Sequence, residues 1–123
     1  MLLAALVGLA AAFGALARYL LDQAVANRWE PALPWGTWVI NVSGSFVLGL
    51  LTGLALHHGL SAHVLSVLGT GVCGGYTTFS TFNVESVRLA EDGSLVGAVG
   101  NIAGSIAAGL LAAAAGLGLA LVV

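Results

Sequence analysis

The chain has 123 residues, of which 59% are hydrophobic and 18 are glycine, while only three arginines and five acidic residues carry a formal charge. Soluble domains carry a charge on about a quarter of their residues, so this composition excludes an ordinary soluble domain. A net charge of −2 without a basic cluster gives no sign of nucleic-acid binding. The single cysteine excludes an intrachain disulfide.

The charged residues fall in two patches, 18–30 and 85–92, which leave charge-free runs of 17, 54 and 31 residues. A helix needs about 20 apolar residues to cross a membrane, so the middle run has room for two helices. We therefore predict an all-α membrane protein with a single domain over residues 1–123. Its four transmembrane helices are expected near Leu2–Leu21, Trp35–Leu56, Val64–Leu89 and Leu95–Val122, with both termini on one side.

The first predicted helix ends in charged residues. Arg18 and Asp22 lie one turn apart and can form an ion pair that orients the helix. All three arginines fall on the side opposite the termini, which the positive-inside rule would place in the cytoplasm. Three arginines, one of them within a span, are a weak bias, so the orientation stays open.

Small residues recur at i+4 spacing in the second and fourth predicted helices, where they allow helix backbones to approach closely. These positions are Ser45, Gly49 and Gly53 in the second helix and Gly100 and Gly104 in the fourth. Asn41 lies one turn before Ser45, and Asn101 begins a similar stripe in the fourth helix. Such an amide either hydrogen-bonds a neighbouring helix or belongs to a functional site.

The third predicted helix contains a glycine pair near mid-membrane. Gly74 lies about 15 Å of helix beyond His63, or half the hydrocarbon thickness. Gly74 and Gly75 are followed by Thr77 and Thr78, whose hydroxyls can cap a new helix. We therefore predict a broken helix at this point, with a packing kink as the alternative. The carbonyl end of the first half suits a cation, and the amide end of the second half suits an anion.

Two phenylalanines follow the predicted break. Phe79 and Phe82 lie three residues apart on one face, and Glu85 continues that face. The edge of a phenyl ring is electropositive, so rings, hydroxyls and an asparagine amide together offer donors without a fixed positive charge. This chemistry suits a small, strongly hydrated anion. A cation path would use rings of acidic groups or carbonyls instead.

Three stretches of the sequence resemble the signature motifs of one known family, the Fluc/CrcB fluoride channels. They are residues 14–19 (GALARY), 41–46 (NVSGSF) and 74–82 (GGYTTFSTF). The resemblance implies a passive, fluoride-selective channel, not an enzyme, that spans the inner cell membrane and exports fluoride from the cytoplasm. It also implies an antiparallel, dual-topology homodimer with two pores along the interface.

The resemblance further implies roles for individual residues. Asn41 would be the amide donor of the pore, and Phe79 and Phe82 would contact fluoride with their ring edges. The same route would include Ser80, Thr81, Glu85 and Ser105, with Arg18 near its aqueous entrance. Asn101 stands where many relatives carry tyrosine, which leaves its part in the polar track of the fourth helix open.

The resemblance also implies a structural sodium ion on the dimer axis, held by the backbone carbonyls of Gly74 and Thr77 from both protomers. Oxygen ligands and the helix-end dipole suit a cation. One broken helix offers only two such carbonyls, whereas a small cation takes about six oxygens, so a second copy of the chain is needed.

Two other classes of membrane protein have a similar size. A proton-coupled multidrug exporter of similar length needs a membrane-embedded carboxylate, and residues 1–17, 31–84 and 93–123 contain none. A structural membrane subunit would need only packing faces and would have no use for Asn41 together with a helix break. Enzyme chemistry is disfavoured, because the three loop histidines lack a carboxylate or cysteine partner nearby in sequence.

Overall fold

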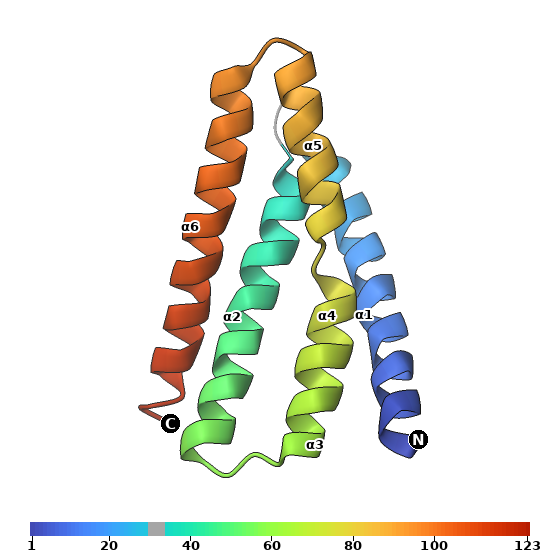
Figure 1. Ribbon diagram of the computed structural model, residues 1–123, viewed down its shortest axis with the longest axis vertical. Coiled ribbons are helices and arrows are strands. Elements are labelled where there is room, and N and C mark those ends of the chain that lie inside the picture. Colours follow the sequence, from blue (N-terminus) through green and yellow to red (C-terminus); the bar gives the residue numbers. More distant parts are fainter. Residues whose placement is uncertain (30–33) are drawn as a thin grey trace.

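The computed structural model describes residues 1–29 and 34–123. Three helices in these residues are long and apolar enough to cross a membrane: α1 (Leu2–Ala26), α2 (Trp35–His57) and α6 (Leu95–Leu119). A fourth rod spans residues 62–91 (Figure 1). The predicted all-helical class and the four helical rods are confirmed, and three of the rods have the length and hydropathy of membrane spans. α1 is longer than predicted, and α6 is shorter.

The fourth rod consists of several helical pieces in succession. They are α3 (Ala62–Leu65), the π-helical segment η1 (Ser66–Cys73), α4 (Gly74–Tyr76) and α5 (Phe79–Glu91). The wide turns of η1 are visible at its end, where the backbone N–H of Gly74 bonds the carbonyl of Gly69, five residues earlier. An extended dipeptide at residues 77–78 separates α4 from α5.

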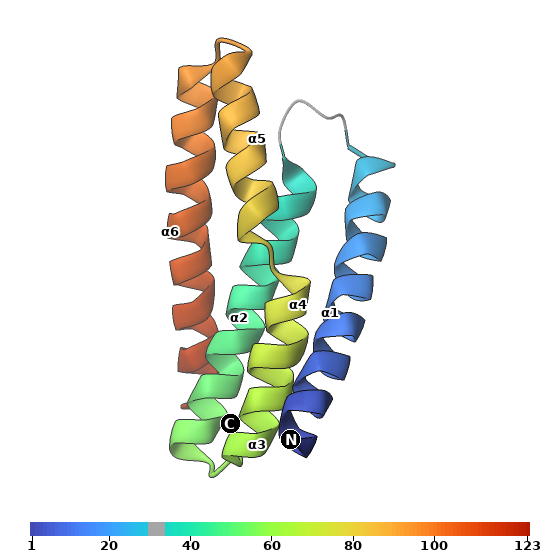
Figure 2. The same cartoon turned by 45° about the vertical axis from the view of Figure 1, so that its right-hand side comes forward.

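The rods pack so that the broken one changes its neighbour partway along. α2 packs along α6, while η1 and α4 pack against α1. Beyond the break, α5 packs against α6 instead (Figures 1 and 2). Both termini lie at the end of the bundle that carries the α2–α3 loop, as predicted (Figure 1).

Glycines and hydroxyl side chains set the helix ends. Gly59 and Gly93 follow α2 and α5 with φ of 70° and 84°, a left-handed conformation that ends a helix and favours glycine. Ser61, Thr78 and Ser94 cap α3, α5 and α6, because each hydroxyl accepts a hydrogen bond from a backbone N–H in the first turn.

Small residues bring α2 and α6 into close contact. A Cβ on Gly49 would collide with the backbone of Ala113, and one on Gly116 would collide with the carbonyl of Phe46. Gly104 of the predicted stripe lies under the indole ring of Trp38. The α2 contact face is therefore confirmed, and it packs against α6.

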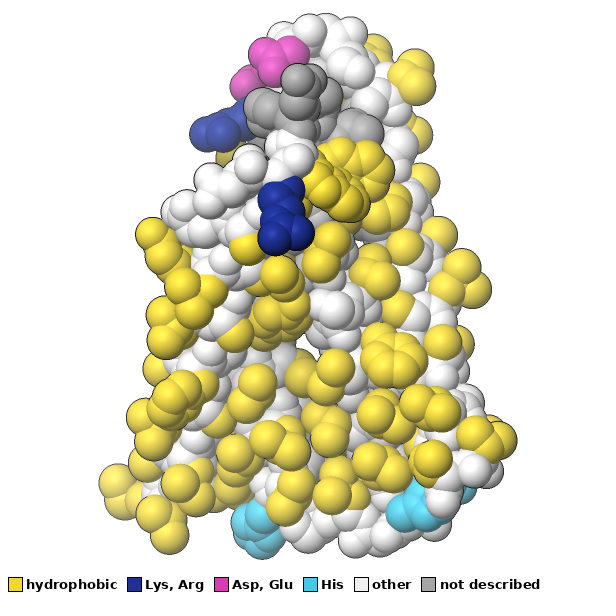
Figure 3. All heavy atoms as spheres, turned by 180° about the vertical axis from the view of Figure 1, so that it is seen from behind, with side chains coloured by type: hydrophobic (Ala, Val, Ile, Leu, Met, Phe, Trp, Pro, Cys, Tyr) yellow, Lys and Arg dark blue, Asp and Glu magenta, His cyan; other side chains and the backbone are white. Residues whose placement is uncertain are grey.

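The surface has the belt that a lipid bilayer requires. The face shown in Figure 3 carries apolar side chains over its middle, with the acidic and arginine side chains in the upper part and the histidines at the lower end. The apolar belt and the long helices describe a multi-pass membrane protein.

Candidate ion site at the helix break

The break in the third rod lies at Thr77 and Thr78, whose φ and ψ angles of −77° and 158° and of −141° and 124° are extended. The predicted break at Gly74 and Gly75 was wrong by three residues, since Gly74 is helical, with φ −65° and ψ −37°. A Cβ on Gly75 would collide with the carbonyl of Ala11. The glycine is therefore needed for close packing of α4 on α1 and not for unwinding.

The side chain of Asn41 holds the extended segment. Its Nδ2 donates to the carbonyl of Thr78 at 2.9 Å, and its Oδ1 accepts from the backbone N–H of Thr78 at 2.8 Å. In an unbroken helix that N–H would bond the carbonyl of Gly74. The amide of Asn41 therefore takes the place of a helical hydrogen bond, and the carbonyl of Gly74 loses its helical partner.

Hydroxyl groups cluster at the start of α5. The Oγ1 of Thr78 accepts from the backbone N–H of Thr81 at 3.2 Å and donates to the Thr81 hydroxyl at 3.0 Å. The Ser80 hydroxyl lies 3.3 Å from the same oxygen. Ser80 and Thr81 are exposed and lie at the electropositive end of the helix.

Phe79 and Phe82 lie on one face of α5, with ring centroids 5.8 Å apart. Phe82 is only 7% exposed, whereas 76% of Phe79 is exposed. The predicted pair thus divides into one ring that packs inside the chain and one that projects from it.

A shallow hollow of about 280 Å³ opens beside the break. It is lined by Asn41, Gly44, Ser45, Leu48, Gly69, Cys73, Gly74, Thr77, Thr78 and Phe79. Four of the predicted site residues, Asn41, Gly74, Thr77 and Phe79, therefore meet at one place, although they come from two different spans. No charged side chain is among the described residues that line it.

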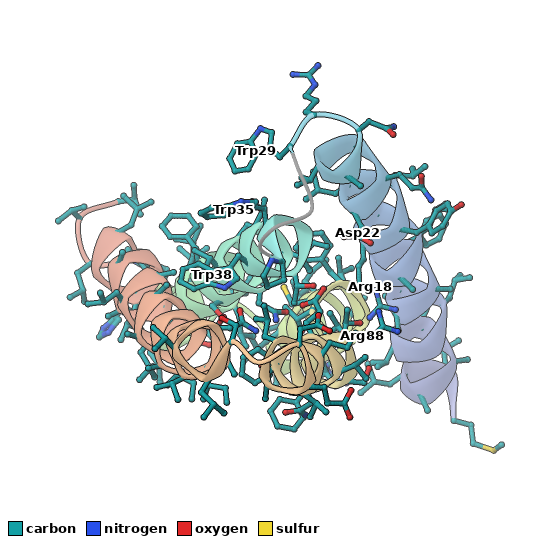
Figure 4. The ribbon with its side chains drawn as sticks, turned by 90° about the horizontal axis from the view of Figure 1, so that it is seen from above. Arg18, Asp22, Trp29, Trp35, Trp38 and Arg88 are labelled. Atoms are coloured by element: carbon teal, nitrogen blue, oxygen red, sulfur yellow. The ribbon has the colours of Figure 1, made fainter. Side chains whose placement is uncertain are left out.

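The charged residues lie nearer the end of the bundle. Thr37 on α2 donates to the Oε1 of Glu85 at 2.8 Å, and the Nη1 of Arg18 donates to the carbonyl of Thr77 at 3.4 Å. The predicted ion pair of Arg18 with Asp22 is not formed in the described chain. The carboxyl group of Asp22 instead lies against Gly36 in the first turn of α2, where the helix dipole favours a negative charge. Figure 4 shows Arg18 and Asp22 pointing from α1 toward the other helices.

The polar residues of α6 form a second group. Asn101 is buried, and it bonds Trp38 through its oxygen and Ser86 through its nitrogen. The hydroxyl of Ser105 lies 3.5 Å from the oxygen of Asn101, at the limit of a hydrogen bond. Neither residue lines the hollow at the break as far as the described chain extends.

Sequence reasoning missed several partners of the predicted residues. Thr37, which bonds Glu85, lies one turn before Asn41 and extends the polar stripe of α2, so the same spacing could have identified it. The sequence marks Trp38 only as a tryptophan near a membrane interface, and nothing in the sequence marks Ser86 as a hydrogen-bond partner. Their roles depend on how α2, α5 and α6 meet in space.

The family comparison and the similar known proteins point to the same family. Residues 5–117 match the family described as CrcB-like protein, Camphor Resistance (CrcB). The chain is 47% identical over 115 residues to a Frankia casuarinae protein named fluoride-specific ion channel FluC 1, with 89% of each chain covered. It is 50% identical over 115 residues to FluC 2 of Cutibacterium acnes, covering 92% of this chain and 93% of the relative. A FluC 1 of Streptomyces avermitilis is 50% identical over 104 residues, covering 85% and 84%.

Proposed function

The chain belongs to the CrcB family, and from this membership and its site we propose that it is a fluoride-selective ion channel that lets fluoride leave the cytoplasm passively. One observation carries the proposal: an anion-suited break within a membrane span, where neutral donors gather beside a hollow that no charged side chain lines among the described residues. The one basic group that reaches the break, the guanidinium of Arg18, bonds the carbonyl of Thr77. The donors are the amide of Asn41 and the first turn of α5.

Neutral donors suit fluoride because the ion is small and holds its hydration shell strongly, so a site must replace that shell and still release the ion. The Nδ2 of Asn41 carries two hydrogens, and only one is used by the carbonyl of Thr78. The second hydrogen is available to an anion in the hollow. The electropositive edge of the exposed Phe79 ring adds a contact of the same sign.

A second, antiparallel copy of the chain would complete the site. The hollow opens onto the surface of the chain, and a Cβ on Gly74 would meet nothing within 4 Å among the described residues. A polar break facing lipid would leave backbone groups without partners, which costs several kcal/mol for each group. A partner copy that covers this face removes that cost, and two copies would enclose two pores.

The antiparallel arrangement is tested by labelling an engineered cysteine from each side of the membrane. Asp92→Cys places a thiol in the exposed α5–α6 loop, and the native Cys73 is buried, with Cys73→Ser as the control. We expect about half of the copies to react from each side. Labelling from one side only would contradict dual topology.

A structural sodium ion would fit between the two copies. Among the described residues, the carbonyl of Gly74 lacks its helical partner, and the carbonyl of Thr77 accepts only the long hydrogen bond from Arg18. These two oxygens from each protomer would hold the ion, with oxygen-only ligands that suit it. A bound cation would neutralise the converging carbonyl dipoles and make the flanking region more favourable for an anion.

Fluoride efflux from proteoliposomes tests the function. Vesicles loaded with fluoride and chloride, and made permeable to potassium with valinomycin, are expected to release fluoride and retain chloride. Empty vesicles control for leak. Release of both ions at equal rates, or of neither, would contradict the proposal.

A further inference from the structure

A chain of polar groups, of which Asn101 and Ser86 are buried and Trp38 is half-buried, joins α2, α6 and α5 on the far side of the bundle from α1. The indole N–H of Trp38 donates to the Oδ1 of Asn101 at 2.7 Å, and the Nδ2 of Asn101 donates to the hydroxyl of Ser86 at 2.9 Å. The Ser86 hydroxyl donates in turn to the carbonyl of Phe82 at 2.8 Å. We call Trp38, Asn101 and Ser86 the α2–α6–α5 relay.

The relay leaves little of Asn101 for an ion. Both ends of its amide are bonded inside the protein, as those of Asn41 are, but Asn101 and Ser86 are only 5% exposed. The second Nδ2 hydrogen of Asn101 is therefore enclosed by protein. Turning the amide toward a pore would break two short hydrogen bonds of a buried side chain. Asn41 differs, because its amide reaches a hollow that opens to the outside of the chain.

The position of the relay fits a need that the break creates. α5 has 13 residues and is separated from α4 by two extended residues, so α4 does not fix its rotation about its own axis. The relay attaches α5 to α6 and α2 at Ser86, one turn after Phe82. The indole ring of Trp38 packs against Gly104, and this contact fixes the α2 end of the relay.

We propose that Asn101 and Ser86 are positioning residues, which set the rotation of α5 and so the place of its first turn, with the exposed Phe79 ring, beside the hollow at the break. Neither residue contacts the ion. This inference rests on the proposed function, because it assigns a role in a fluoride path. It differs from a polar track along α6, in which Asn101 would touch fluoride.

Two variants and a matched control test the role by fluoride efflux. Ser86→Ala and Asn101→Leu are each expected to lower the efflux rate about tenfold, and the double variant is expected to fall no further, because both changes break the same relay. Ser66→Ala is the control, since Ser66 also donates at 2.8 Å to the carbonyl four residues earlier but belongs to no relay. Ser86→Thr keeps the hydroxyl and should restore transport.

These results separate positioning from other roles. Full transport by Ser86→Ala would overturn the proposal, as would an equal loss in Ser66→Ala or multiplied losses in the double variant. If Asn101→Leu does not yield a folded protein, Ser86→Ala compared with Ser86→Thr decides alone. A failure of Ser86→Thr to transport better than Ser86→Ala would also count against the relay.

A second readout does not depend on transport. In a Trp29→Phe/Trp35→Phe background, the fluorescence comes from Trp38 alone. Ser86→Ala touches no tryptophan directly, yet it should shift the emission of Trp38 by releasing Asn101, whereas Ser66→Ala should not. No shift would overturn the relay. A shift in a protein that does not transport fluoride would support the relay and reject the proposed function.

Discussion

Two hydrogen bonds from the side chain of Asn41 to the backbone of Thr78 hold the helix break, and we call them the Asn41 clamp. Asn41→Leu keeps most of the side-chain volume but removes both hydrogen bonds to the backbone of Thr78, which measure 2.9 and 2.8 Å. Hydrogen bonds between membrane helices average about 0.6 kcal/mol and reach about 1.7, so the two together are expected to stabilise the fold by about 1 to 3 kcal/mol. The backbone groups left unpaired place the expected loss toward the upper end of that range.

The assay is equilibrium unfolding in mixed micelles, followed by fluoride efflux on the same preparation. Ser45→Ala is the stability control, because Ser45 lies one turn further along the same face of α2 and its hydroxyl has no hydrogen bond within the described chain. Its free energy of unfolding should change by less than about 0.5 kcal/mol. Asn41→Asp should lower fluoride efflux at least as much as Asn41→Leu, because an ionised carboxylate only accepts hydrogen bonds and repels an anion. If Asn41→Leu unfolds like the parent and Asn41→Asp transports like it, the clamp and the donor role are both refuted.

Three further predictions concern the rings, the glycines and the cation. Phe79→Ile and Phe82→Ile should both lower fluoride efflux strongly by removing an electropositive ring edge. Only Phe82→Ile should also destabilise the fold, by about 1 kcal/mol, because only this ring is buried. Efflux equal to that of the parent in both variants would mean that the rings serve only for packing. Gly75→Ala should destabilise the fold by about 1 to 3 kcal/mol through its collision with Ala11. Gly74→Ala should leave the chain folded and weaken the proposed dimer, as measured by size-exclusion elution, and a stable Gly74→Ala dimer would contradict the proposed interface. Replacing sodium by a large organic cation, with long incubation, should lower fluoride efflux, although the parent protein should carry no sodium current. Unchanged efflux would count against the proposed cation site.

Composition and periodicity predicted most of the fold, because the membrane restricts what a chain can do. Spans must be helical and about 20 residues long, so charge-free runs give their number and approximate limits. The i+4 stripe of Gly49 and Gly53 marked the close contact that α2 makes with α6, since a small residue has few other uses at such a position.

The exact place of the break could not be predicted, because it depends on a tertiary contact. Gly74 and Gly75 are the residues most able to leave a helix, yet both remain helical because α4 must approach α1. Asn41, which lies on another span, pairs with the backbone of Thr78 and stabilises the extended conformation there. Local propensity was overridden by a side chain 37 residues away.

The sequence likewise predicted some contacts of the site and not others. Asn41 and Phe79 meet at the hollow because motif residues from two spans converge there. Sequence spacing alone predicts an ion pair of Asp22 with Arg18. In the structure the carboxylate of Asp22 lies instead at the electropositive start of α2. The relay from Trp38 to Ser86 could not be predicted, because its members lie on three helices whose relative rotation only the fold defines.

The most direct test of the central claim is the reversal potential of a planar bilayer that contains the protein, with sodium fluoride on one side and an equal concentration of sodium chloride on the other. Sodium then has no concentration gradient, so a reversal potential away from zero reports selection between the two anions. A fluoride-selective channel should give a potential far from zero, with the sign set by the fluoride gradient. A reversal potential at zero would mean either that fluoride and chloride pass equally or that sodium carries the current, and both results would contradict a fluoride-selective channel.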